Sequence, residues 1–148
     1  MTPDAVMARA VAIDLGSRRI GVAVCDSAGT MAFPKTVIHR GAEPADDVAA
    51  IAAVVTEVGA TTIVVGLPVS LDGRDGPAAR RARAEAEELA RGLGGVRVVL
   101  FDERLTTVSA EAALAAGGRR RRRDRGELDA AAAAVLLQAW LDAGGPTP

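Results

Sequence analysis

Hydrophobic residues in the first forty positions come in short runs separated by turn residues. The runs VAIDLG (11–16), IGVAVCD (20–26) and roughly MAFPKTVI (31–38) have the composition of strands, and Ser17–Arg19 and Ser27–Thr30 connect them. Connections of this length join antiparallel neighbours. The pattern therefore predicts an antiparallel meander of three strands.

Beyond residue 43 the pattern alternates between helical and strand periods. Apolar residues recur at helical spacing from Pro44 until Gly59, and the apolar run TTIVVGLP (61–68) suits a strand covered on both faces. After the loop SLDGRDGP (70–77), the remaining predicted elements are a helix over 78–91, a strand over 96–103, and helices over about 108–116 and 127–143. This order predicts an α/β fold, with a mixed five-stranded sheet and helices on both faces.

The length of 148 residues suits one domain over 1–148, with a flexible N-terminus (1–9) and a C-terminal tail (143–148). No apolar run approaches the roughly 18 residues of a membrane span, and the first residues do not resemble a signal peptide. Cys25 is the only cysteine, which excludes an internal disulfide and a cysteine-based zinc site. We therefore expect a cytoplasmic protein without membrane contact.

The formal net charge of −1 conceals a local concentration of arginine. Arg119–Arg123 are five consecutive arginines, and Arg121, Arg122 and Arg123 are candidates for contact with nucleic acid phosphates. Lys35 is the only lysine among 18 basic residues, so compositional bias towards arginine is an alternative explanation. A solvated loop therefore stays as open as a nucleic acid contact.

Three acidic positions lie at or beside apolar elements. Asp14 lies inside the first strand, Asp102–Glu103 end the last strand, and Asp129 begins the last helix. Burying a lone carboxylate is costly, and three carboxylates together suit Mg²⁺ or Mn²⁺, which prefer oxygen ligands. Each has a simpler explanation too: Asp129 could be a first-turn helix acid, and Asp102 could cap a turn, pointing opposite to Glu103. Asp14 has the weakest structural alternative.

Four motifs in order resemble the YqgF family, also called RuvX or Holliday-junction-resolvase-like proteins. IDLGSRRIGVAVCD resembles its D-x-G-x-x-R-I-G-x-A-x-x-D opening, and VVGLPVSLDG resembles its V-G-L-P motif with a downstream D-G. FDERLTT is similar to its D-E-R-[LYF]-[ST]-[ST] signature, and LDAAAAAVLLQAWLD to its terminal motif. The motifs span residues 13–142, and the predicted element order is that of the ribonuclease H fold.

The resemblance implies a ribonuclease H-like nuclease that matures the 5′ end of precursor 16S rRNA or, by fold analogy, cleaves four-way DNA junctions. It implies that Asp14, Glu103 and Asp129 are catalytic, metal-binding acids for Mg²⁺ or Mn²⁺. Arg18 and Arg104 match basic positions of the family and would contact phosphate. Gly66 would let backbone approach the substrate, although a tight turn explains it equally. Structured nucleic acid, in a ribosomal particle or as branched DNA, is the implied partner.

Two other functions are alternatives to the nuclease. A nucleic-acid-binding ribosome-assembly factor with little catalysis of its own is the main alternative, and 2% aromatic residues would limit base stacking. A third hypothesis takes DLGS as the phosphate loop of actin-like sugar kinases, but those enzymes need two such domains. The sequence decides neither between RNA and DNA nor between monomer and homodimer, and it leaves open whether Cys25 cross-links two chains or Asp102 joins the metal site.

Overall fold

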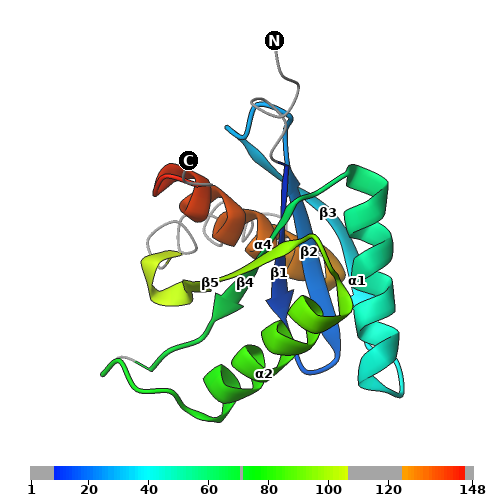
Figure 1. Ribbon diagram of the computed structural model, residues 1–148. Helices are drawn as coiled ribbons and strands as arrows, with labels where there is room; N and C mark the ends of the chain where they lie inside the picture. Colours follow the sequence, from blue (N-terminus) through cyan, green and yellow to red (C-terminus); the bar gives the residue numbers. More distant parts are fainter. Residues whose placement is uncertain (1–8, 71, 107–124, 146–148) are drawn as a thin grey trace.

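The structure, a computed structural model, describes residues 9–70, 72–106 and 125–145. Figure 1 shows a central sheet with helices covering both of its faces. The elements in chain order are β1 (Ala10–Leu15), β2 (Arg19–Cys25), β3 (Ala32–His39), α1 (Pro44–Val58), β4 (Thr62–Leu67), α2 (Pro77–Gly92), β5 (Arg97–Asp102), the 3₁₀ helix η2 (Glu103–Thr106) and α4 (Arg125–Asp142).

The sheet has the strand order β3-β2-β1-β4-β5, with β1 at its centre. β1 and β3 both pair antiparallel to β2, whereas β4 runs parallel to β1 and β5 runs parallel to β4. Two short turns make the antiparallel half, and helical crossovers make the parallel half. The predicted mixed five-stranded sheet is confirmed.

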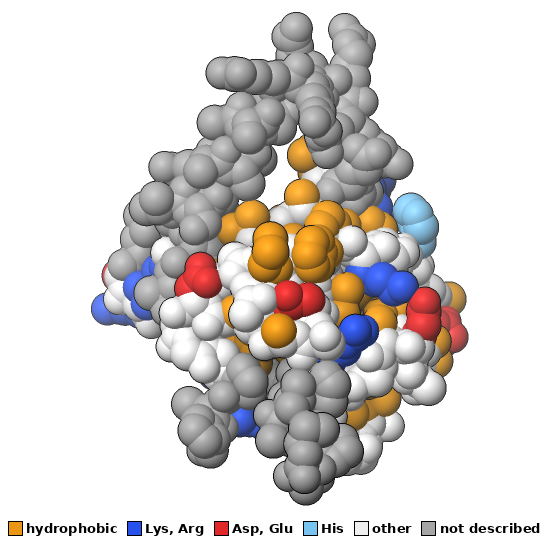
Figure 2. Space-filling model, turned by 90° about the horizontal axis from the view of Figure 1, so that it is seen from above, with side chains coloured by type: hydrophobic (Ala, Val, Ile, Leu, Met, Phe, Trp, Pro, Cys, Tyr) orange, Lys and Arg blue, Asp and Glu red, His pale blue; other side chains and the backbone are white. Residues whose placement is uncertain are grey.

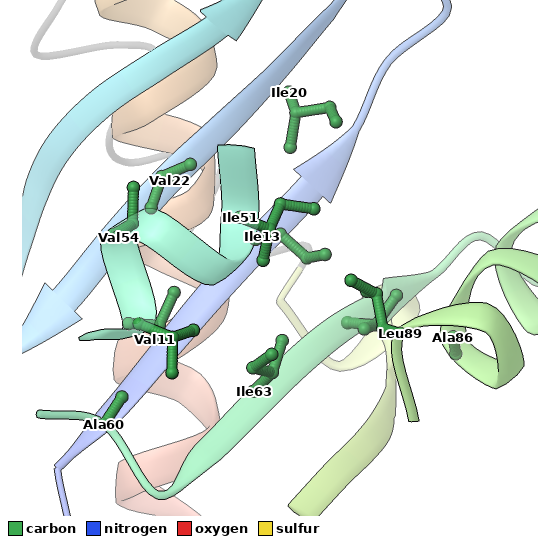
Figure 3. Close-up of a cluster of buried hydrophobic side chains, with 12 residues drawn as sticks. Val11, Ile13, Ile20, Val22, Ile51, Val54, Ala60, Ile63, Ala86 and Leu89 are labelled. Carbon is green, nitrogen blue, oxygen red and sulfur yellow. The ribbon is translucent and has the colours of Figure 1, made fainter. Parts of the chain in front are cut away.

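Strand alternation gives the sheet two different faces. On one face, large β-branched residues such as Ile13, Val22 and Ile63 pack against Ile51 of α1 and Leu89 of α2. Figure 3 shows these side chains pointing toward one another between the sheet and the two helices. This face holds the larger buried cluster, and it fixes the register of the central strands because a one-residue slip would turn them outward.

The opposite face is lined by small residues and is covered by α4. Ala12, Ala23 and Cys25 pack there against Leu137 and Trp140. Small side chains let a helix lie close to the strands, and α4 crosses behind the sheet in Figure 1. Helices therefore cover both faces, as predicted, and the next residue on this face after Ala12 is Asp14.

The helix ends follow local signals in the sequence. Glu43 and Asp46 form a reciprocal capping box at the start of α1, and Gly59 ends it with a φ of 69°. α2 starts at Pro77, one residue before the prediction. β5 ends at Asp102 rather than Glu103, because the chain turns there into η2. The helix predicted over 108–116 and Arg119–Arg123 lie outside the described residues.

Few large hydrophobic side chains of the described residues reach the surface. Met31, Phe33 and Leu128 are the exposed ones. Seen from above, the surface carries a group of hydrophobic side chains with charged side chains around it (Figure 2). Among the described residues, no helix has both the length and the apolar character needed to cross a membrane.

Candidate active site

Asp14 lies on the α4 face of the central strand, between two glycines. It pairs with Gly21 of β2. β1 pairs with β4 up to Ile13 and Val65, so Gly66 is the next residue on the other side of Asp14. Neither neighbour has a side chain, so both sides of Asp14 are open for groups from other parts of the chain.

The first opening admits the start of α4. A Cβ atom at Gly21 would lie 2.0 Å from the backbone oxygen of Asp129. Only glycine fits such an approach, because real Cβ contacts are longer than 3.0 Å. Gly21 therefore lets the backbone of Asp129 rest on β2, directly beside Asp14.

The second opening admits the side chain of Glu103. A Cβ atom at Gly66 would lie 3.1 Å from Cδ of Glu103 and 3.2 Å from its Oε2. Glu103 has the parity of Phe101, which faces α4, and it begins η2 just past the end of β5. The two glycines thus position Glu103 and Asp129 on either side of Asp14.

The three acids influence one another electrostatically. The pKa of Asp14 is raised, first by burial and then by the negative charge of Asp129. Burial raises the pKa of Glu103 to about 7, with further contributions from the charges of Asp14 and Asp102. The three acids predicted from the sequence therefore lie near one another in the structure. Ionisation is made less favourable for two of them, Asp14 and Glu103.

Asp102 has the opposite strand parity to Glu103, and its carboxylate is paired with Arg104. Its carboxylate accepts hydrogen bonds from Nε and Nη2 of Arg104, the latter at 2.6 Å, and Arg104 lowers its pKa. Arg104 also donates through Nη1 to the backbone oxygen of Ser70, 3.4 Å away. This pair ties the loop after β4 to the end of β5, so Arg104 has a structural role beside the acids.

Arg19 contacts one of the three acids, Asp129. Its Nε donates to Oδ2 of Asp129 at 2.6 Å. Arg19 begins β2 and has the parity of Gly21, so it faces α4. By contrast, the neighbouring Arg18 is exposed in the turn before β2.

The turn that carries Arg19 is fixed from behind. The amide of Gly16 donates to the backbone oxygen of Arg19 at 2.9 Å, and a Cβ atom at Gly16 would lie 2.6 Å from that oxygen. The Nε of Arg40 donates to the backbone oxygen of Gly16, while its Nη groups donate to Asp47 and Glu85. A largely buried ion-pair network thus fixes the turn.

The donor types at this site suit a hard divalent cation, since all three are carboxylates. Two of the three have raised pKa values because of negative charge and burial, and a cation would offset both effects. In the described residues, no three acidic, histidine or cysteine side chains form a group with metal-ligand geometry. The donor chemistry fits a cation, although the described side chains do not form a metal-binding group as they stand.

Comparison with known proteins identifies the family. The model of the RuvX family, described as Holliday junction resolvase, matches residues 8–143. The chain belongs to the RuvX family. A protein of Anaeromyxobacter sp. (strain Fw109-5), named "Putative pre-16S rRNA nuclease", is 50% identical over 135 residues, which are 90% of this chain and 96% of that protein. A protein of Myxococcus xanthus with the same name is 44% identical over 138 residues, or 93% of this chain and 90% of that protein.

Solved structures support the fold. RuvC of T. thermophilus, in complex with a Holliday junction substrate, superposes with a TM-score of 0.58 at 18% identity, over 92% of this chain and 96% of that one. The yeast mitochondrial Holliday junction resolvase Ydc2 gives a TM-score of 0.57 at 10% identity, over 92% and 78%. The RuvX chain therefore has a RuvC-like ribonuclease H fold, as the motifs indicated.

The RuvX opening motif also accounts for the arginine that the sequence analysis missed. In D-x-G-x-x-R-I-G, with Asp14 first, the arginine falls on Arg19, not on Arg18. Strand alternation carries the same signal, because Arg19, Gly21 and Ala23 share a face. The candidate phosphate contacts Arg121, Arg122 and Arg123 lie outside the described residues.

Proposed function

We propose that this chain is a divalent-cation-dependent endonuclease that hydrolyses phosphodiester bonds in structured nucleic acid. The observation that carries the proposal is the convergence of Asp14, Glu103 and Asp129, from three distant segments, at one end of the sheet. Three carboxylates at one end of the sheet suit a site for Mg²⁺ or Mn²⁺ facing a phosphate.

The three acids would hold the cation in the proposed enzyme. When bound in a two-ion arrangement, such ions lower the pKa of water and stabilise the leaving oxygen. Asp14 is fixed by the central strand, Glu103 by η2 and Asp129 by α4 and Arg19. The chain itself contributes three carboxylates, brought from distant segments to one end of the sheet.

Precursor 16S rRNA is the proposed substrate, because relatives at 44–50% identity carry that substrate in their names. A ribosomal particle would then be the cytoplasmic partner. Cleavage of four-way DNA junctions is the second candidate, since the family model is described as a Holliday junction resolvase. A homodimer would suit symmetric cleavage of a junction, whereas a monomer would suffice for trimming RNA.

The test is cleavage by the purified chain, with Mg²⁺ or Mn²⁺, of a precursor 16S rRNA fragment and of a four-way DNA junction. Asp14→Asn should reduce cleavage by on the order of 100-fold or more, because the ion site contributes several kcal/mol. It should leave folding intact, since burial already disfavours the Asp14 charge. Glu87→Gln removes an exposed carboxylate from α2 and serves as the control.

Two results would refute the proposal. Equal cleavage by the Asp14→Asn variant and the unchanged protein would remove the acids from the mechanism. Tight binding without cleavage, on naked RNA and on ribosomal particles with either metal, would favour the assembly factor.

A further inference from the structure

Arg19 combines contact with the proposed active-site acids and unused hydrogen-bond donors. Its Nε is bound to Asp129, yet within the described residues no protein group accepts a hydrogen bond from its Nη atoms. A guanidinium has five N–H donors, so most of its capacity is left. The side chain is 27% exposed, which leaves it accessible to solvent.

Two other described arginines near the site, Arg104 and Arg40, use all three nitrogens of the guanidinium group. Nε and Nη2 of Arg104 donate to Asp102, and its Nη1 donates to the backbone oxygen of Ser70. All three side-chain nitrogens of Arg40 donate hydrogen bonds, to Gly16, Asp47 and Glu85. These two arginines connect protein segments and have little left to offer a ligand.

The surroundings of Arg19 favour a phosphate as the missing acceptor. A group of carboxylates repels a polyanionic strand, so a fixed positive charge next to the acids lowers that repulsion. A guanidinium matches phosphate oxygens in a bidentate manner. Asp129 also restrains the side chain, which reduces the entropy lost on binding.

We propose that Arg19, anchored through Nε on Asp129, binds a backbone phosphate of the nucleic acid strand at the active site through its Nη groups. The proposal rests on the proposed nuclease function and assigns the contact to Arg19 in place of Arg18. Because phosphates are common to every sequence, the contact would give affinity and position without base specificity.

The test compares neighbouring arginines that carry the same charge. Arg19→Gln and Arg18→Gln are each made in the full chain with Asp14→Asn, so that the probe is not cut. Fluorescence anisotropy with Mg²⁺ then gives the Kd for a labelled four-way DNA junction and for a labelled RNA hairpin with a single-stranded 5′ extension, at several salt concentrations.

Arg19→Gln should raise the Kd about tenfold on both probes. It should also reduce the slope of log Kd against log salt by about one, the value for one lost phosphate contact. Arg18→Gln should change the Kd less than about threefold, because an unanchored surface side chain must be ordered on binding. Equal effects of the two variants would overturn the proposal, since net charge alone would then explain them.

Folding and the underlying function are checked separately. The Arg19–Asp129 pair is partly exposed, so its loss should hardly change Tm. If Arg19→Gln does not fold, the comparison is made with Arg19→Lys and Arg18→Lys. Only Arg19→Lys should weaken binding, because lysine lacks the planar guanidinium that binds phosphate through two N–H groups. Equal Kd values for the two lysine variants would overturn the proposal. Failure of the unsubstituted chain to bind and cleave either probe would refute the nuclease instead.

Discussion

Removing the charge of Glu103 should stabilise the protein at alkaline pH. Burial and the neighbouring acids raise its pKa from 4.5 to about 7. The folded state therefore binds more protons than the unfolded state between those values, and stability falls as pH rises through that window. Above about pH 8 the full cost of the ionised carboxylate is present, and Glu103→Gln abolishes it.

The magnitude follows from the shift in pKa. A shift from 4.5 to about 7 corresponds to roughly 3 kcal/mol, and partial exposure of the side chain reduces this to on the order of 2 kcal/mol. For a chain of this length the gain corresponds to an increase in Tm of about 4–8 °C. The gain should vanish near pH 4, where Glu103 is protonated in both states.

The assay is thermal or urea unfolding between pH 4 and 8.5, with EDTA present to remove divalent cations. Asp102→Asn is the matched control in the adjacent position. Arg104 lowers the pKa of Asp102, so this change should destabilise the protein throughout the series, because that stabilisation is lost only as pH falls below about 4. Equal or lower stability of Glu103→Gln at pH 8, or a gain that persists at pH 4, would refute the reasoning.

Three further predictions concern packing, a polar clamp and the cation. Gly21→Ala should cost about 1–3 kcal/mol in unfolding experiments, because its Cβ would lie 2.0 Å from the Asp129 oxygen, whereas Gly94→Ala should be near neutral since nothing lies within 4 Å. Gln138→Ala should cost about 1–3 kcal/mol in urea unfolding, since Gln138 accepts from the Ala32 amide and donates to the Thr30 carbonyl. Mg²⁺ at 100 times its Kd should raise the free energy of unfolding of the unsubstituted protein by about 2.7 kcal/mol, measured as a higher Tm, and should stabilise Asp14→Asn much less.

Local signals in the sequence explain why most of the fold could be predicted. Pro44 and Gly59 mark the ends of α1 to within a residue, and the continuous apolar run of β4 announced a strand covered on both faces. The end of β5 was misplaced by one residue, because η2 starts at Glu103 without a proline or glycine to mark it. Local chemistry is thus a good guide wherever a residue fixes its own backbone.

Of the candidate site residues, Asp14 was the clearest from residue type alone, whereas the roles of Glu103 and Asp129 followed from the family resemblance. Asp14 stood out because a carboxylate interrupts a buried strand, and no knowledge of its neighbours was needed. Arg19 did not stand out beside Arg18, because what distinguishes them is the face of β2, and that depends on which face α4 covers. The partner of Arg19, which is Asp129 at a separation of 110 residues, could not be identified from either segment alone.

Two glycines lie beside Asp14 in the sheet and make room for the other acids. Gly66 looked like a turn residue that would admit substrate, yet the group that lies against it is the side chain of Glu103. Gly21 and Gly66 are adjacent to Asp14 through pairings that only the sheet register creates. The candidate site therefore depends on the two glycines as well as on the acids. The central strand supplies the carboxylate of Asp14, and the absence of side chains at its two glycine neighbours makes room for Asp129 and Glu103.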